Sequence, residues 1–224
     1  MTFKTSLRAL CIGGLEISQR HKPGALCVTE MQDRGGLAVH NCHWVVRFLE
    51  TLPAGTRLTE LTARLTEIVH AVSRRHNRSP GVLVNATGKG KSVVEQLESK
   101  VGRGRFYTIY FNQGDRRVDE SDFQDYIVTV GKAYLVSAVQ TALQTERLHF
   151  PRSAEFDQPA EELLNFEIDL PPDANERYGS FRVGTRDELV NALGLTVQHK
   201  PGPTTAIGGP EPSSFTIDGI KVYT

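Results

Sequence analysis

A short apolar run followed by a glycine-rich turn constrains this chain more than any other segment. The residues Gly81-Val-Leu-Val-Asn85 indicate a buried strand, and Ala86-Thr-Gly-Lys-Gly90 indicates a turn after it. The pattern over 91–100 predicts a helix directly behind that turn. Alternation of strands and helices implies parallel strands joined by crossover helices, so we expect an α/β fold.

The same turn permits two incompatible functional interpretations. From Asn85 onward, it is one residue short of the nucleotide-binding loop G-x-x-x-x-G-K-[ST], with Lys91 and Ser92 in the last two positions. Asn85 replaces the first glycine, and the next strand, over 107–112, ends without the aspartate that would hold magnesium. An NTPase is therefore the third hypothesis. In the other interpretation, Asn85 ends a strand where many α/β enzymes carry a metal-binding carboxylate.

The other elements predict a mixed sheet flanked by helices. Three β-rich runs come first and are joined by short turns, which suggests an antiparallel meander. Helical spacing of apolar residues follows, and strands and helices then alternate. The predicted strands are 7–17, 25–30, 37–48, 82–84 and 105–111, and the predicted helices are 59–75, 91–100, 132–143 and 154–166. A polar loop is expected over 112–125.

The last helix is expected to open with a capping box. Thr185 can accept a hydrogen bond from the amide of Glu188, and the Glu188 carboxylate can reach back to the Thr185 amide. The segments 166–170 and 179–183 ahead of this helix flank a loop, as the strands of a hairpin do.

One domain is expected over residues 1–198, followed by a tail over 199–224. Four prolines within twelve residues predict a linker at the start of the tail, and Asp218-Gly219 predicts a terminal hairpin. With 26 basic and 26 acidic residues the formal net charge is zero, so any polyanion must bind to local patches. No apolar run reaches the roughly 18 residues of a membrane span. An odd number of cysteines, three, favours a reducing cytosol.

The order of elements matches the ribonuclease-H-like plan, in which three antiparallel strands are followed by parallel strands. Folds of this plan place acidic groups at the end of the first strand, on the fourth strand and on the last helix. There they hold two divalent cations, which require oxygen ligands because magnesium is a hard ion. The predicted catalytic residues are Glu16, Asn85 and Asp187, and Glu188 joins them as a predicted metal ligand.

Three segments carry a resemblance to a known family. The run Gly14-Leu-Glu16-Ile-Ser-Gln-Arg-His-Lys22-Pro-Gly resembles the first-strand motif in the nuclease domain of phage terminase large subunits. The run Asn85-Ala-Thr-Gly-Lys-Gly is similar to the Asp-Ala-Thr-Gly-x-Gly segment of that family. The block 178–193 resembles its closing block, His-Asp-Asp-Leu-Val-x-Ala-Leu. The resemblance extends over roughly residues 7–198 in consistent order.

This resemblance implies a metal-dependent DNA endonuclease, a hydrolase that cuts concatemeric phage DNA during packaging. It implies Mg²⁺ or Mn²⁺ as cofactor, double-stranded DNA as substrate, and a phage or prophage origin with the bacterial host cytoplasm as location. The family's motor domain does not precede the nuclease-like strand, so a packaging ATPase on another chain, or a portal protein, is an expected partner. The predicted nucleic-acid contacts are Lys22, Lys89, Lys91, Lys132 and Arg186.

Three positions depart from the family pattern. Glu16 is one methylene longer than the usual aspartate, Asn85 replaces an acid by an amide, and Lys22 stands where the family often has an acid. Lost ligand charge weakens the binding of a hard cation, so the second metal should bind more weakly. A weakened nuclease is the leading hypothesis, and a catalytically inactive descendant that binds DNA or packaging proteins is the alternative. The basic runs 74–78 and 103–105 are expected to contact DNA only if they flank the cleft.

Overall fold

The computed structural model describes residues 8–33, 42–102, 104–121, 126–151, 156, 187–198, 215–217 and 220–222. The strands of the main sheet are β1 (Arg8–Glu16), β2 (Gly24–Asp33), β3 (Cys42–Leu52), β4 (Gly81–Asn85), β5 (Arg105–Asn112), β6 (Arg117–Asp119), β7 (Ile127–Gly131) and β8 (Leu148–His149). The helices are α1 (Leu58–His76), α2 (Lys91–Val101), α3 (Lys132–Gln144) and α5 (Glu188–Val197). A separate antiparallel pair is formed by β9 (Phe215–Ile217) and β10 (Ile220–Val222).

The main sheet is mixed, and its strand order is β6-β7-β5-β4-β1-β2-β3-β8. Its two halves meet at β1, which pairs with β2 in antiparallel and with β4 in parallel orientation. Strand β5 lies between β4 and β7 and is parallel to both. The predicted ribonuclease-H-like sheet, with three antiparallel strands followed by parallel strands, is confirmed.

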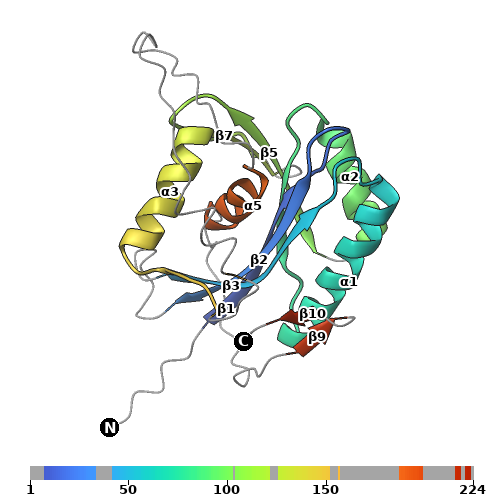
Figure 1. The fold of residues 1–224 in the computed structure, drawn as a ribbon, viewed down its shortest axis with the longest axis horizontal. Coiled ribbons are helices and arrows are strands. Elements are labelled where there is room, and N and C mark those ends of the chain that lie inside the picture. Colours follow the sequence, from blue (N-terminus) through green and yellow to red (C-terminus); the bar gives the residue numbers. More distant parts are fainter. Residues whose placement is uncertain are drawn as a thin grey trace.

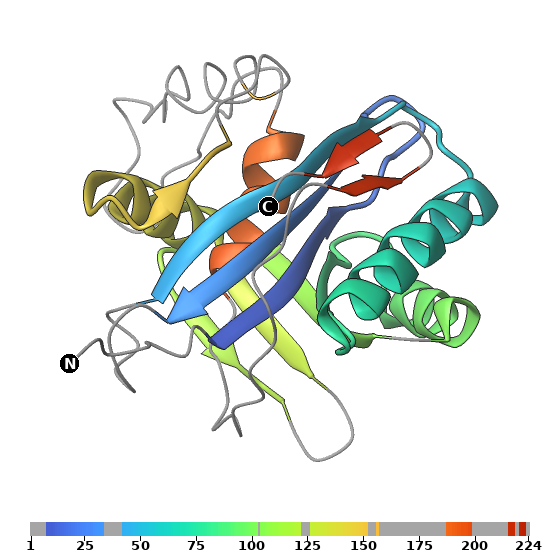
Figure 2. The same ribbon diagram turned by 90° about the horizontal axis from the view of Figure 1, so that it is seen from below.

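Helices cover both faces of this sheet (Figure 1). Helices α1 and α2 lie on one face, and α3 and α5 lie on the other, as the view from below also shows (Figure 2). Each face has its own apolar core, one around Leu65 and Leu97 and the other around Leu135 and Leu193. Strand β4 is buried along its whole length because it is covered on both sides, which is why its sequence is a continuous apolar run rather than an alternating one.

Two glycines let α5 pack closely against its neighbours. A Cβ on Gly14 of β1 would lie 2.0 Å from the Ala192 carbonyl oxygen of α5. A Cβ on Gly194 of α5 would lie 2.2 Å from a Leu135 methyl group of α3. Since neither space admits a methyl group, these glycines fix the depth at which α5, with Asp187 at its start, sits on the sheet.

Most of the predicted elements up to residue 143 are confirmed with shifts of a few residues at their ends. The predicted polar loop over 112–125 is wrong in part, because Arg117–Asp119 forms the edge strand β6 beside β7. Strand β6 is short and lies at an edge, so its sequence lacks a marked hydrophobic alternation. Strands β7 and β8 were not predicted, because segments of five and two residues are too short for a periodic pattern.

The predictions near the C-terminus have mixed outcomes. The last helix is present, and its N-cap is Asp187, whose carbonyl accepts the first helical hydrogen bond, from Asn191 N at 2.8 Å. Thr185 and the segments 157–186 lie outside the described residues, as does nearly all of the predicted helix 154–166. The terminal hairpin is confirmed by the pairing of β9 with β10. None of the helices in the described part is long and apolar enough to span a membrane.

Candidate functional site

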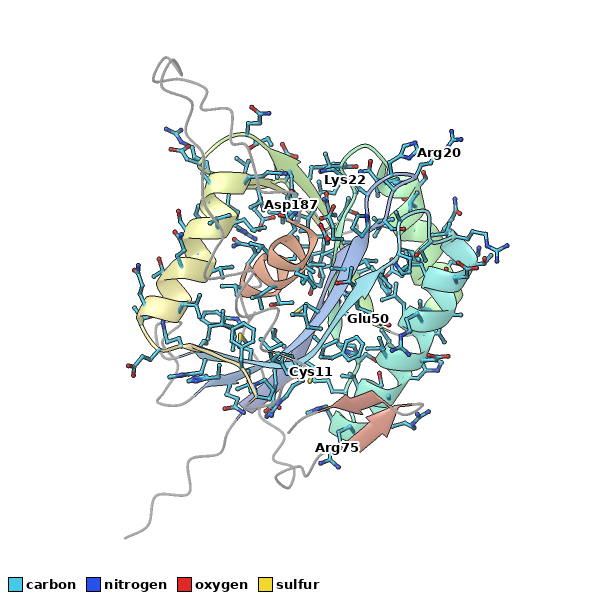
Figure 3. The ribbon with its side chains drawn as sticks, in the orientation of Figure 1. Cys11, Arg20, Lys22, Glu50, Arg75 and Asp187 are labelled. Atoms are coloured by element: carbon cyan, nitrogen blue, oxygen red, sulfur yellow. The ribbon has the colours of Figure 1, made fainter. Side chains whose placement is uncertain are left out.

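The register of two parallel strands brings Glu16 and Asn85 together. Strand β1 ends at Glu16 and β4 ends at Asn85, and these two residues are direct partners in the ladder. Asp187 reaches the same end of the sheet from the N-terminus of α5, which packs on β1 and β2. Figure 3 shows Asp187 and Lys22 at this end of the molecule. The three predicted catalytic positions therefore lie in one region, although they are up to 171 residues apart in sequence.

Asn85 is held by two hydrogen bonds that fix the orientation of its amide. Its Oδ1 accepts from the backbone N–H of Thr87 at 3.0 Å, and its Nδ2 donates to Glu16 Oε2 at 2.7 Å. Because the Thr87 N–H can only donate, the atom facing it must be the amide oxygen, and the nitrogen must face Glu16. Asn85 thus presents a donor to the carboxylate beside it.

Asp187 is contacted by two lysines from different parts of the fold. Lys132 opens α3 directly after β7, and its Nζ lies 3.1 Å from Asp187 Oδ2. Lys22 lies in the tight turn between β1 and β2, closed by a 2.8 Å hydrogen bond from Gln19 N to Lys22 O, and its Nζ is 4.0 Å from Asp187 Oδ1. Lys22 is largely exposed, whereas Asp187 is buried, so Lys132 makes the stronger contact.

Burial raises the pKa of Glu16 to about 7, the largest contribution being loss of solvation. The Asn85 hydrogen bond lowers this pKa, the negative charge of Asp187 raises it, and Lys132 and Lys22 lower it. Glu16 is therefore about half ionised near neutral pH. A carboxyl group in this state can change its charge when a cation or a phosphate arrives.

The described side chains at this site supply fewer anionic oxygens than two divalent ions need. In the part of the chain that the structure describes, no three His, Cys, Asp or Glu side chains come together as a metal-binding group. Asn85 turns its nitrogen toward Glu16, so among the described residues the carboxylates that meet beside it are those of Glu16 and Asp187. Two carboxylates suit a single hard cation whose other ligands are water and substrate phosphate, because Mg²⁺ is commonly bound in that way.

The other predicted residues lie at different distances from this centre. Lys89 lies in the turn after β4, and Lys91 is the first residue of α2, at the same end of the sheet. Lys91 forms an ion pair with Glu95 at 3.5 Å. Glu188 is 5% exposed at the start of α5, next to Asp187. Arg186 lies outside the described residues.

Sequence reasoning missed the role of Thr87 in positioning Asn85. Thr87 donates its backbone N–H to the Asn85 amide, and its Oγ1 accepts from Phe111 N at 2.7 Å. It thereby ties the end of β4 to β5 and holds the Asn85 side chain in place. The pattern Asn-x-Thr after a strand is the available signal, because an asparagine oxygen often accepts from the amide two residues later.

Comparison with solved structures identifies the fold. The nuclease domain of the large terminase subunit gp2 of bacterial virus Sf6, as a lysine-to-alanine mutant with manganese and β-thujaplicinol, aligns with a TM-score of 0.54 at 11% identity. The alignment covers 87% of this chain and 90% of that domain. The same mutant with manganese gives 0.52 at 10% identity, over 87% and 90%. The chain has the fold of a terminase nuclease domain.

The human cytomegalovirus terminase nuclease domain, soaked with manganese, also aligns, with a TM-score of 0.49 at 9% identity over 88% of this chain and 85% of that one. No protein-family model and no curated protein matches the sequence. The terminase-nuclease fold has three antiparallel strands ahead of β4, so the arrangement differs from what a P-loop NTPase requires. The glycine turn over 86–90 is here the link between β4 and α2.

Proposed function

We propose that the chain is a terminase-type nuclease domain that cuts double-stranded DNA with one divalent ion, Mg²⁺ or Mn²⁺. The observation that carries this proposal is the convergence of Glu16 and Asp187 at the ends of β1 and α5, within a terminase-nuclease fold. In its cellular setting we place the domain in the bacterial cytoplasm, in a phage or prophage packaging system, with a packaging ATPase or portal protein as partner. Residues 1–198 form the domain and 199–224 a tail.

The cations around the carboxylates suit a nucleic-acid backbone. Lys22 and Lys132 contact Asp187, and Lys89 and Lys91 lie in the neighbouring turn and helix start. These ammonium groups can bind the phosphates on either side of a scissile bond and neutralise charge that develops there. A divalent ion bound to Glu16 and Asp187 would activate water and polarise the phosphate.

Plasmid cleavage tests the proposal directly. Supercoiled DNA is incubated with the wild-type chain in Mg²⁺ and in Mn²⁺, beside Asp187→Asn and the control Asp115→Asn, whose carboxylate is 84% exposed in the β5–β6 loop. We expect nicking by wild type and by the control, and none by Asp187→Asn. Cleavage that persists in Asp187→Asn, or no cleavage in either metal, would contradict a nuclease at this site.

A second function, binding of DNA without cleavage, is favoured because side chains of the chain itself already compensate the charges of the carboxylates. Asn85 and two lysines already occupy the carboxylates, so the folded chain needs no metal to compensate their charge. The same lysines would hold DNA in a catalytically inactive descendant. Binding of duplex DNA in EDTA that is weakened by Lys132→Gln, together with no cleavage in any metal, would establish this alternative.

A further inference from the structure

Four cations gather at the end of the sheet opposite the carboxylates. They are Arg74 at the end of α1, Arg78 in the following loop, Lys100 in the last turn of α2 and Arg105 at the start of β5.

Two contacts hold these segments next to one another. His70 Nε2 lies 3.3 Å from the Val101 carbonyl oxygen, which places the last turns of α1 and α2 side by side. Arg105 N donates to Pro80 O at 3.2 Å, which places the start of β5 beside the loop before β4. We call these four residues the far basic face.

Two tyrosines lie within this face. The rings of Tyr107 and Tyr126 are 4.9 Å apart, and the Arg105 guanidinium lies 5.4 Å from the centre of the Tyr126 ring. Arg105 Nη1 also donates to the Tyr126 hydroxyl oxygen at 3.3 Å. Burial raises the pKa of Tyr107, while Arg105 and Arg78 lower it, so both arginines act on the same phenol. Tyr126 is 37% exposed.

The positive charges of the far basic face are not neutralised by acidic side chains in the described part of the chain. None of its four cations forms an ion pair with a carboxylate among the described residues. Of the nearby acids, Glu98 accepts from Phe106 N at 3.5 Å, and Glu120 lies beside the start of β7. Arg74 and Lys100 also complement the helix dipoles at the ends of α1 and α2. Arg78 and Arg105 lie outside the helices, so helix stabilisation does not explain them.

This face cannot be part of the carboxylate site. In the ladder Gly81 pairs with Arg105, and Asn85 pairs with Ile109, so the face lies at the amino ends of β4 and β5. Five extended residues span about 13 Å at about 3.3 Å per step, before the loop that carries Arg78 is added. In Figure 3, Arg75, the neighbour of Arg74, lies at the end of the molecule opposite Asp187 and Lys22. The basic run 74–78 therefore does not flank the cleft.

We propose that the far basic face binds the backbone of a second stretch of nucleic acid. Arginine, lysine and tyrosine are among the side chains that contact phosphate oxygens, and clustered cations without acidic partners provide the attraction. The faces of Tyr107 and Tyr126 are partly covered by each other and by Arg105, so this surface reads phosphates and not bases. The face lies at the opposite end of the sheet from Asp187, so a duplex held across the carboxylates would leave it open to a second DNA segment.

Binding of a labelled 30-base-pair duplex to the full chain, followed by fluorescence anisotropy in EDTA over a range of salt, tests this proposal. The test variant is Arg78→Gln/Arg105→Gln, and the matched control is Arg57→Gln/Arg116→Gln, which removes two exposed arginines that contact Glu60 and Asp115. Both pairs are made in an Asp187→Asn background, so the result does not depend on cleavage. We expect the test variant to lose about two units of slope in log K against log salt, since each neutralised phosphate contributes about 0.9. Affinity at low salt should fall at least tenfold, with no change in the control.

A second readout separates this face from the carboxylate site. Two duplexes carrying donor and acceptor dyes should be brought together by the chain, and this energy transfer should be lost in the test variant and also in Lys22→Gln/Lys132→Gln. If the test variant is unfolded by circular dichroism, Arg74→Gln/Lys100→Gln at the exposed helix ends replaces it, with the same expectation. Unchanged affinity and salt slope would overturn the proposal. The proposal would also be overturned if the test variant bound DNA as wild type does but no longer bound polyaspartate. The far basic face would then be a binding surface for an acidic protein.

Discussion

Restoring an acid at position 85 should lower the stability of the metal-free chain and make it respond to divalent metal. In Asn85→Asp, the oxygen that accepts from Thr87 N is kept, but the Nδ2–H donor to Glu16 Oε2 at 2.7 Å is lost. Two carboxylates then face each other at hydrogen-bond distance in a partly buried site. The variant therefore changes one interaction and leaves the neighbouring one in place.

The size of the effect follows from that single contact. A hydrogen bond to a charged group contributes about 1.5–3 kcal/mol, and the repulsion that replaces it is limited because the pair can take up a shared proton. We expect the free energy of unfolding to fall by about 2–4 kcal/mol in EDTA at pH 8. A fall of 1 kcal/mol lowers Tm by about 2–4 °C in a domain of this size, so Tm should drop by roughly 5–15 °C.

Divalent metal should reverse this loss in the variant and have a smaller effect on wild type. A ligand at a hundred times its Kd adds about 2.7 kcal/mol to the stability of the folded state, which is similar to the loss. Thermal unfolding in EDTA and in Mn²⁺ measures both quantities. Asn112→Asp is the matched control, because it changes an exposed asparagine at the end of β5 whose Oδ1 accepts from Gly114 N, a contact that aspartate retains. A variant as stable as wild type in EDTA, with no response to Mn²⁺, would refute the assigned geometry of Asn85.

Two further predictions concern the same site. Because burial raises the pKa of Glu16 to about 7 from an unfolded value near 4.5, the folded state binds this proton more tightly. The contribution of Glu16 to stability is therefore full below about pH 4.5, and up to about 3 kcal/mol is lost as pH rises through 7. Urea unfolding at pH 5.5, 7 and 8.5 should show that Glu16→Gln removes this loss of stability with rising pH. If the variant lost as much stability as wild type over this range, the loss would come from other titratable groups. Gly14→Ala should cost about 2–3 kcal/mol because its Cβ meets the Ala192 backbone oxygen at 2.0 Å. Gly13→Ala should be tolerated, because its Cβ lies at ordinary contact distance, 3.6 Å from the Val82 methyl groups and 3.8 Å from the Gly81 oxygen. Equal melting temperatures for these two alanine variants would show that α5 does not depend on the close approach at Gly14.

The elements that sequence reasoning placed correctly are those whose pattern is strong over many residues. Helix α1 has apolar side chains at helical spacing over 19 residues, and β4 is a continuous buried run with a glycine turn behind it. Strands β6 and β8 have three and two residues, and they exist because neighbouring strands offer free backbone groups. Such pairing depends on tertiary contacts, which no local pattern contains.

The site was predictable in its positions and not in its contacts. The ends of β1 and β4 could be brought together from the order of elements, so Glu16 and Asn85 were expected to meet. The Thr87 N–H determines that Asn85 turns its nitrogen toward Glu16. The position at which β7 ends determines that Lys132 reaches Asp187. Both facts concern directions of side chains in the folded chain, which spacing along the sequence does not determine.

The charges around Glu16 and Asp187 connect the stability of this fold with its chemistry. Carboxylates that are withdrawn from water need compensation, and a metal ion, an ammonium group or an amide donor can supply it. Here Lys132, Lys22 and Asn85 do so within the chain itself. If a divalent ion binds at Asp187 as proposed, it would compete with Lys132 and would gain less on binding than at carboxylates without partners. Each change that frees an anionic oxygen for metal, such as Asn85→Asp, removes part of what stabilises the metal-free domain. Metal affinity and metal-free stability should thus vary in opposite directions across variants of this site.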